Sequence, residues 1–319
     1  MHNVLITGGL GYIGSFTCKY IKNVKRLKLT SVDNLSRGNS FAKKYCKNYQ
    51  IDISNKNKII ELIKKKKINT VLHLAAYTCV RESFTKKNLY KKNNYIKQKK
   101  FIDILTKIGI KNLIFASSYS LFINKLNLEK MSPYVKYKLL IEKYLKKKSN
   151  KNFKVIIIRY PNVAGASLDG KLGEKNDFIN RIFPTFIKLI LNRKKINLYY
   201  DFKKKKYPSR NYLHVEDIAS FNYKIIQYMP KMSKNLIYIN LINDVFFSNF
   251  TIMQKIALKL NRFCNFRKKQ LKKIETIKPK INFQKKDLLK KINWKKKFSN
   301  IDTILRTNLL WIKKRKGLK

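Results

Sequence analysis

The stretch TGGLGYIG at residues 7–14 closes the apolar run at residues 3–7 and holds four of the ten glycines in the chain. Gly8 permits a tight turn out of a strand, Gly11 lets the backbone approach a pyrophosphate, and Gly14 lets the next helix pack closely. The free N–H groups at the start of that helix favour phosphate binding. The stretch therefore predicts a strand, a dinucleotide-binding loop and a helix.

Outward from this loop, apolar runs of strand length alternate with amphipathic stretches of helix length. This pattern is typical of α/β proteins with a doubly wound parallel sheet. The expected strands are residues 3–7, 27–32, 48–53, 70–74, 112–117 and 155–159. The expected helices lie near residues 13–23, 56–66, 89–108 and 134–147. With the glycine loop, this alternation leads us to expect a Rossmann-type dinucleotide-binding domain over residues 1–160.

Beyond residue 160 the alternation weakens, and short strands at residues 196–200 and 236–240 are mixed with helices and longer polar loops. We interpret residues 161–319 as a smaller, mixed α/β substrate-binding lobe, from which some segments return to the first domain. Open α/β sheets bind ligands outside the carboxyl ends of their strands. The second lobe is therefore expected to lie over that edge of the sheet.

The formal net charge is +57, from 74 Lys and Arg against 17 Asp and Glu. A charge of this size suggests a polyanionic partner. However, the lysines are spread along the whole chain, and no RNA-binding, helix-turn-helix or zinc-finger pattern accompanies them. The abundance of Lys, Asn and Ile is what an A/T-rich coding bias produces. We therefore expect no nucleic-acid partner.

The four cysteines are scattered and form no C-x-x-C pair, so neither a metal site nor a redox motif is expected; they are Cys18, Cys46, Cys79 and Cys264. The strand pattern at residues 2–7 leaves no room for a signal segment, and no apolar run is long enough to cross a bilayer. The expectation is a cytoplasmic protein with no membrane partner.

Asp33 lies nineteen residues beyond Gly14, at the end of the second expected strand. A carboxylate there accepts hydrogen bonds from the adenosine ribose and repels a 2′-phosphate, which favours NAD over NADP. Arg37 lies close enough in the sequence to keep NADP open. Asp52 and Ile53 end the third expected strand, where they are placed to meet the adenine; an Asp that merely closes a strand is the alternative.

A second cluster, SPYVKYK at residues 132–138, places Tyr134 and Lys138 four residues apart, on one face of an expected helix. A lysine ammonium beside a phenol lowers the pKa of that phenol, so Tyr134 is suited to take a proton from an alcohol. Ser118 ends a strand of buried type, at the sheet edge where it can bind the reacting oxygen. Tyr137 is a competing phenol that lacks the four-residue spacing.

With these motifs the chain resembles the extended short-chain dehydrogenase/reductases, and among them the UDP-glucose 4-epimerases. The resemblance covers most of residues 2–220 and also rests on DNLS at 33–36, HLAA at 73–76, VRES at 80–83, NN at 93–94, RYPN at 159–162 and RNYLHV at 210–215. It implies an isomerase that binds NAD tightly, takes a UDP-sugar and forms a homodimer. The implied reaction inverts C4 of a UDP-hexose through a transient 4-keto sugar.

The resemblance also implies roles for individual residues. The implied catalytic trio is Ser118, Tyr134 and Lys138. The implied cofactor contacts are Gly8, Gly11, Tyr12, Ile13, Gly14, Asp33, Asn34, Asp52, Ile53, Ala75, Asn93, Lys138 and Tyr160. The implied substrate contacts are Ser118, Asn162 and Arg210. Late in the chain, KKIETIK at residues 272–278 replaces the R-x-G-D segment of the family, and Lys273 is expected to supply its phosphate contact.

Two alternatives stay open. One is another nucleotide-sugar epimerase, dehydratase or decarboxylase of the same family, and the other is a catalytically silent descendant that binds NAD or RNA. A 4,6-dehydratase is disfavoured because that branch carries an acidic pair directly after the hydroxyl residue, where this chain has Tyr119 and Ser120. The presence of Ser118, Tyr134 and Lys138 together argues against a catalytically silent protein.

Overall fold

The computed structural model describes residues 2–24, 27–122, 131–175, 181–270 and 286–316. The chain divides into two compact units. The first comprises residues 1–160, 216–241 and 283–295, and the second comprises residues 161–215, 242–282 and 296–319. Two segments that follow residue 160 in the sequence therefore belong to the first unit.

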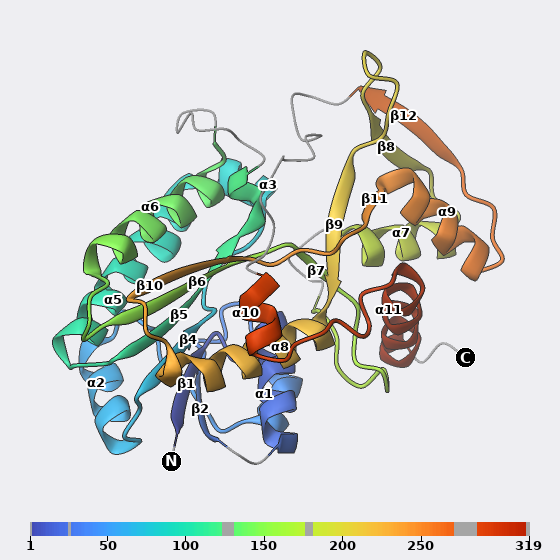
Figure 1. Ribbon diagram of the computed structural model, residues 1–319. Coiled ribbons are helices and arrows are strands. Elements are labelled where there is room, and N and C mark those ends of the chain that lie inside the picture. Colours follow the sequence, from blue (N-terminus) through green and yellow to red (C-terminus); the bar gives the residue numbers. More distant parts are fainter. Residues whose placement is uncertain (1, 25–26, 123–130, 176–180, 271–285, 317–319) are drawn as a thin grey trace. The chain divides into compact units, whose positions relative to one another are not determined.

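The first unit is built on a seven-stranded sheet in which all pairs are parallel (Figure 1). Across the sheet the strands are β10 (Leu236–Asn240), β6 (Lys154–Tyr160), β5 (Asn112–Ser118), β4 (Thr70–His73), β1 (Asn3–Thr7), β2 (Lys28–Val32) and β3 (Asn48–Tyr49). The order reverses between β1 and β4, and such a switch point is where open α/β sheets bind ligands. The expected doubly wound parallel sheet is confirmed.

Helices cover both faces of this sheet (Figure 1). One face carries α2 (Lys56–Lys65), α5 (Lys97–Lys107) and α6 (Pro133–Lys148), and the other carries α1 (Tyr12–Val24) and α8 (Val215–Tyr228). On the first face, side chains such as Ile59, Phe101 and Ile141 of the helices pack with Val71 and Phe115 of the strands. Burial of these apolar side chains is the main favourable term for the layered fold.

Shorter elements complete the first unit. They are η1 (Ser40–Tyr45), α3 (Val80–Thr85), α4 (Lys87–Lys91), η2 (Lys92–Ile96), η3 (Tyr119–Phe122), η4 (Met229–Lys231) and α10 (Lys286–Lys291). The helix expected at residues 89–108 is thus α4 and α5 joined through η2, which is π-helical. A π-helical turn inside a longer helix often marks a functional site.

Two expected strands differ from the structure. The third ends at Tyr49 rather than at residue 53, because this edge strand pairs only with β2 and the Ile51 N–H turns back to the Tyr49 carbonyl at 2.9 Å. The strand at residues 236–240, expected in the second lobe, is β10 and pairs with β6 in the first sheet. Its pairing partner lies about eighty residues earlier, so local sequence carried no sign of it.

The described residues of the second unit form two small sheets. One holds β11 (Phe246–Ser248), β9 (Ser209–His214) and β7 (Asn162–Ala164), and the other holds β12 (Phe266–Gln270) and β8 (Ile196–Tyr200). Buried apolar side chains of α7 (Ile182–Leu191), α9 (Asn249–Lys259) and α11 (Ile301–Lys316) form its core. Among the described helices of the chain, none has both the length and the apolar character needed to span a membrane.

Candidate active site

The glycine-rich loop joins β1 to α1 at the switch point of the sheet. Gly8 has a φ of +69°, and its N–H donates to the Val32 carbonyl at 2.8 Å. A Cβ on Gly8 would lie 2.8 Å from the Ala75 nitrogen, and a Cβ on Gly14 would lie 2.1 Å from the Gly8 oxygen. Both distances are far inside van der Waals contact. The loop therefore has the tight turn and the close helix packing that dinucleotide binding requires.

A pocket lies beside this loop, within the first unit. Eight residues expected to contact the cofactor line it: Gly8, Gly11, Asp33, Asn34, Asp52, Ile53, Ala75 and Asn93. Its lining does not include Tyr12, Ile13, Gly14, Lys138 or Tyr160. It does include Ser36, Gly38 and Tyr77, for which the sequence predicted no role. Their positions shortly after expected strands could have indicated this, because the loops that follow parallel strands lie at the ligand-binding edge of the sheet.

Asp33 is buried at the pocket wall, and its carboxylate accepts hydrogen bonds from the N–H groups of Leu10 at 3.1 Å and Leu35 at 2.8 Å. Burial raises the pKa of this carboxyl, while the hydrogen bonds from Leu35 and Leu10 oppose the rise. A carboxylate has lone pairs for about four hydrogen bonds. These backbone donors, together with the Gly11 N–H, orient Asp33 and leave acceptor capacity for ribose hydroxyls.

Asp52 is held at the pocket by several donors. Its carboxylate accepts hydrogen bonds from Asn34 Nδ2 at 3.0 Å and from Lys97 Nζ at 2.5 Å. Burial raises the pKa of Asp52, but Lys97, Ser54 and Asn34 lower it more, to about 2. Asp52 therefore remains an anion with a fixed orientation.

A buried histidine, His73 at the end of β4, helps to fix the backbone that lines the pocket. His73 Nδ1 lies 2.6 Å from Thr7 Oγ1, and Nε2 lies 2.6 Å from Gln98 Oε1. A carbonyl oxygen only accepts, so Nε2 carries the proton of the neutral ring. Gln98 Nε2 in turn donates to the Ala75 carbonyl at 2.6 Å. This chain fixes the backbone at Ala75, a role that the HLAA motif did not reveal.

Burial lowers the pKa of His73 from 6.5 to about 3. Between pH 6.5 and about pH 3, His73 is therefore protonated in the unfolded chain but neutral in the folded chain. The free energy of unfolding falls as the pH drops through this window. We expect this difference at His73 to lower the free energy of unfolding by about 1.4 kcal/mol for each pH unit below 6.5. Urea unfolding between pH 7 and pH 5 measures this slope. His73→Gln should make the slope shallower, and an unchanged slope would contradict the assignment.

The predicted catalytic side chains come from α6 and the end of β5. Ser132 caps α6 by accepting a hydrogen bond from the Val135 N–H at 3.3 Å, so the helix begins at the motif itself. Tyr134 and Lys138, one turn apart, are both buried. Lys138 Nζ donates to the carbonyl of Ala116 at 2.5 Å, two residues before Ser118.

Glu142 lies one turn beyond Lys138 and was not identified from the sequence. Its buried carboxylate accepts hydrogen bonds from Arg159 Nε at 2.9 Å and from the Ser117 hydroxyl. Burial lowers the pKa of Lys138 to about 8, and Glu142 acts in the opposite direction. The four-residue spacing from Lys138 was the available signal for Glu142.

Two further tyrosines have their own partners. Tyr137, the competing phenol, stacks on Tyr95 with ring centroids 5.9 Å apart, which directs it toward η2. Tyr160 lies opposite Ser118 in the β5–β6 register, and its hydroxyl donates to Asn222 Oδ1 at 2.5 Å. Burial raises the pKa of Tyr160. Tyr134 is thus the phenol that shares a helix face with Lys138.

Of the expected substrate residues, Ser118 ends β5 in the first unit, whereas Asn162 and Arg210 lie in the second unit. Asn162 of β7 pairs in register with Tyr212 of β9, two residues from Arg210, so the two lie on neighbouring strands. Asn162 Nδ2 donates to the Asn211 carbonyl at 3.1 Å. Lys273 lies outside the described residues.

Comparison with known proteins bears on this arrangement. The model of the NAD dependent epimerase/dehydratase family matches residues 4–239, which hold the glycine loop, the Asp33 strand and the Tyr134–Lys138 helix. The chain belongs to this family. Membership confirms the predicted resemblance to extended short-chain dehydrogenase/reductases, and it confirms NAD as the cofactor.

Individual relatives of this epimerase/dehydratase family member are UDP-glucose 4-epimerases. The enzyme of Lactobacillus helveticus is 28% identical over 264 residues, which cover 79% of this chain and 79% of the relative. A bifunctional UDP-glucose and UDP-xylose 4-epimerase of Pisum sativum is 27% identical over 248 residues, 68% of this chain and 69% of the relative. The crystal structure of UDP-glucose 4-epimerase from Brucella ovis in complex with NAD has a TM-score of 0.85 at 26% identity, covering 96% and 97% of the two chains.

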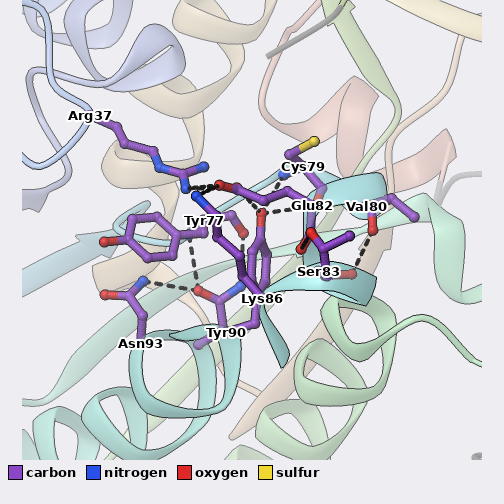
Figure 2. Close-up of polar contacts among 11 residues, drawn as sticks. Arg37, Tyr77, Cys79, Val80, Glu82, Ser83, Lys86, Tyr90 and Asn93 are labelled. Carbon is purple, nitrogen blue, oxygen red and sulfur yellow. Dashed lines mark hydrogen bonds and ion pairs between the residues drawn. The ribbon is translucent and has the colours of Figure 1, made fainter. Parts of the chain in front are cut away.

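One polar cluster at this pocket of the family member was not predicted from the sequence, although the sequence drew attention to Arg37 by its position near Asp33. Figure 2 shows Arg37, Lys86 and Tyr90 converging on the carboxylate of Glu82 in α3. Beside it, Asn94 in η2 donates to the Tyr77 carbonyl at 2.8 Å and accepts from its N–H at 2.9 Å. The π-helical turn therefore fixes the backbone of a residue that lines the pocket.

Proposed function

We propose that this protein interconverts UDP-glucose and UDP-galactose by inverting C4, with NAD held through turnover. The observation that carries the proposal is the buried pair of Tyr134 and Lys138, one turn apart on α6 and tied to the strand that ends in Ser118. UDP-glucose 4-epimerases among the relatives support the choice of sugar and of reaction.

When bound, NAD accepts a hydride from the sugar C4 and returns it to the other face of the 4-keto sugar. Tyr134 takes the proton of the C4 hydroxyl and later gives it back. Lys138, fixed on the Ala116 carbonyl, stabilises the phenolate charge and holds the nicotinamide ribose. Ser118 Oγ accepts from the Ser120 N–H at 3.2 Å, so its own proton is available to the C4 oxygen.

The remaining residues of the proposed site bind and orient the cofactor and the nucleotide-sugar. Gly8, Gly11, Tyr12, Ile13 and Gly14 form the pyrophosphate loop and helix start, Asp33 and Asn34 take the adenosine ribose, and Asp52 and Ile53 lie at the adenine. Ala75, Asn93 and Tyr160 complete the cofactor site. Asn162 and Arg210 hold the nucleotide-sugar, with the guanidinium pairing with pyrophosphate oxygens.

A homodimer is part of the proposal. Its interface would involve the helical run from α4 to α5 together with α6. Leu89 and Ile96 on that run are exposed apolar side chains, 38% and 40% accessible. The proposed interface would remove these two side chains from water.

The function is tested by incubating purified protein with UDP-glucose, without added cofactor, and separating the products by chromatography. We expect UDP-galactose to appear, and NAD to be released when the protein is denatured. Turnover of UDP-xylose or UDP-N-acetylglucosamine in place of UDP-glucose would keep the site and change the substrate. Absence of both bound NAD and turnover would contradict the proposal.

A further inference from the structure

An ion pair lies at the edge of the NAD pocket. Arg37 Nη2 lies 2.6 Å from Glu82 Oε2 and 2.8 Å from Oε1 (Figure 2). The guanidinium carbon also lies 4.0 Å from the centroid of the Tyr77 ring. Arg37 and Tyr77 both line the pocket, and the two charged side chains are only 19% and 16% exposed. Glu82 and Tyr77 thus hold the guanidinium in one orientation.

The Glu82 carboxylate has further partners that keep it in place. The Tyr90 hydroxyl lies 3.0 Å from Oε2, and the Lys86 ammonium lies 3.2 Å from Oε1. Tyr90 is fully buried, and its hydroxyl also lies 2.8 Å from the Cys79 carbonyl. Burial raises the pKa of Glu82, but the hydrogen bonds from Arg37 and Tyr90 lower it more, so the carboxylate stays charged.

Arg37 lies next to the carboxylate expected to bind the adenosine ribose. A Cβ on Gly38 would lie 2.9 Å from Asp33 Oδ1, so the backbone after Arg37 packs directly against Asp33. Arginine beside this ribose is the group that accommodates a 2′-phosphate in NADP-binding proteins. Arg37 Nη1 is buried and has no hydrogen-bond partner among the described groups. The guanidinium of Arg37 therefore keeps an N–H donor without a described partner, while the Glu82 carboxylate neutralises its positive charge.

We propose that Glu82 determines the preference for NAD over NADP by occupying Arg37. This inference rests on the proposed cofactor site. A 2′-phosphate would meet the negative charges of Asp33 and Glu82 and would compete with Glu82 for the guanidinium. Glu82→Gln keeps the shape and the hydrogen-bonding atoms of the side chain but removes one negative charge. The Arg37 cation is then left without its counter-ion, beside the position of the 2′-phosphate.

The test is an exchange experiment on the full-length protein. Protein loaded with NAD is equilibrated with a known mixture of NAD and NADP, freed of unbound nucleotide and denatured, and the released nucleotides are quantified by chromatography. We expect Glu82→Gln to raise the bound NADP:NAD ratio about tenfold over the unsubstituted protein. The double variant Arg37→Met/Glu82→Gln should lose this gain. Lys86→Met removes another cation from the same carboxylate and should leave the ratio unchanged.

A folded Glu82→Gln variant that binds NAD with an unchanged ratio would overturn the inference and leave the cofactor site intact. An equal gain in Lys86→Met, or a gain retained in the double variant, would also overturn it. Should Glu82→Gln fail to fold, Glu82→Asp withdraws the carboxylate by one methylene and must raise the ratio in the same direction. Unsubstituted protein that retains neither dinucleotide would instead refute the proposed cofactor site.

Discussion

Replacement of Tyr134 by Phe is expected to lower the turnover of UDP-glucose by about a thousandfold, because it removes the group that takes and returns the C4 proton. The ring itself packs with Tyr90, Met131 and Val135, and Phe keeps those contacts. The pocket beside the glycine loop does not include Tyr134, so NAD should stay bound. Turnover is measured by chromatography, and bound NAD by its release on denaturation.

Tyr137→Phe is the matched control, since it removes a phenol from the same helix. Tyr137 stacks on Tyr95 and lacks the four-residue spacing from Lys138, so its loss should leave turnover within about twofold. Undiminished turnover in Tyr134→Phe would exclude the assigned base. An equal loss in both variants would indicate a structural effect on α6 rather than a loss of chemistry.

Gly14→Ala is expected to weaken NAD retention by at least about a hundredfold, through backbone geometry alone. The new Cβ would lie 2.1 Å from the Gly8 oxygen and 2.8 Å from the Gly9 Cα, so α1 must move away from the loop. That movement removes the helix N-terminus from the phosphate position. NAD that copurifies with the protein, measured per mole of chain, reports the effect.

Gly109→Ala controls for the general cost of replacing a glycine. Gly109 has a φ of +76°, and a Cβ there meets nothing within 4 Å among the described residues. The variant should therefore lose about 1 kcal/mol of stability from left-handed backbone and retain NAD fully. If Gly14→Ala retains NAD as Gly109→Ala does, the glycine loop is not the pyrophosphate site.

Much of the first unit could be predicted from local sequence, because its signals are local. The glycine spacing at residues 7–14 reports backbone geometry within one turn, and the four-residue spacing of Tyr134 and Lys138 reports one helix face. The apolar runs of the strands report burial on both faces of a parallel sheet. These patterns determined the doubly wound sheet, the cofactor loop and the helix of the candidate base.

Only the tertiary structure decided which distant residues meet. β10 pairs with β6 about eighty positions away, Arg37 pairs with Glu82 45 positions away, and the His73 ring bonds Gln98 25 positions away. In a chain with 74 Lys and Arg, local sequence cannot show which cation a carboxylate binds. That choice depends on burial and on distances between elements, and these exist only once the helices and the sheet have packed.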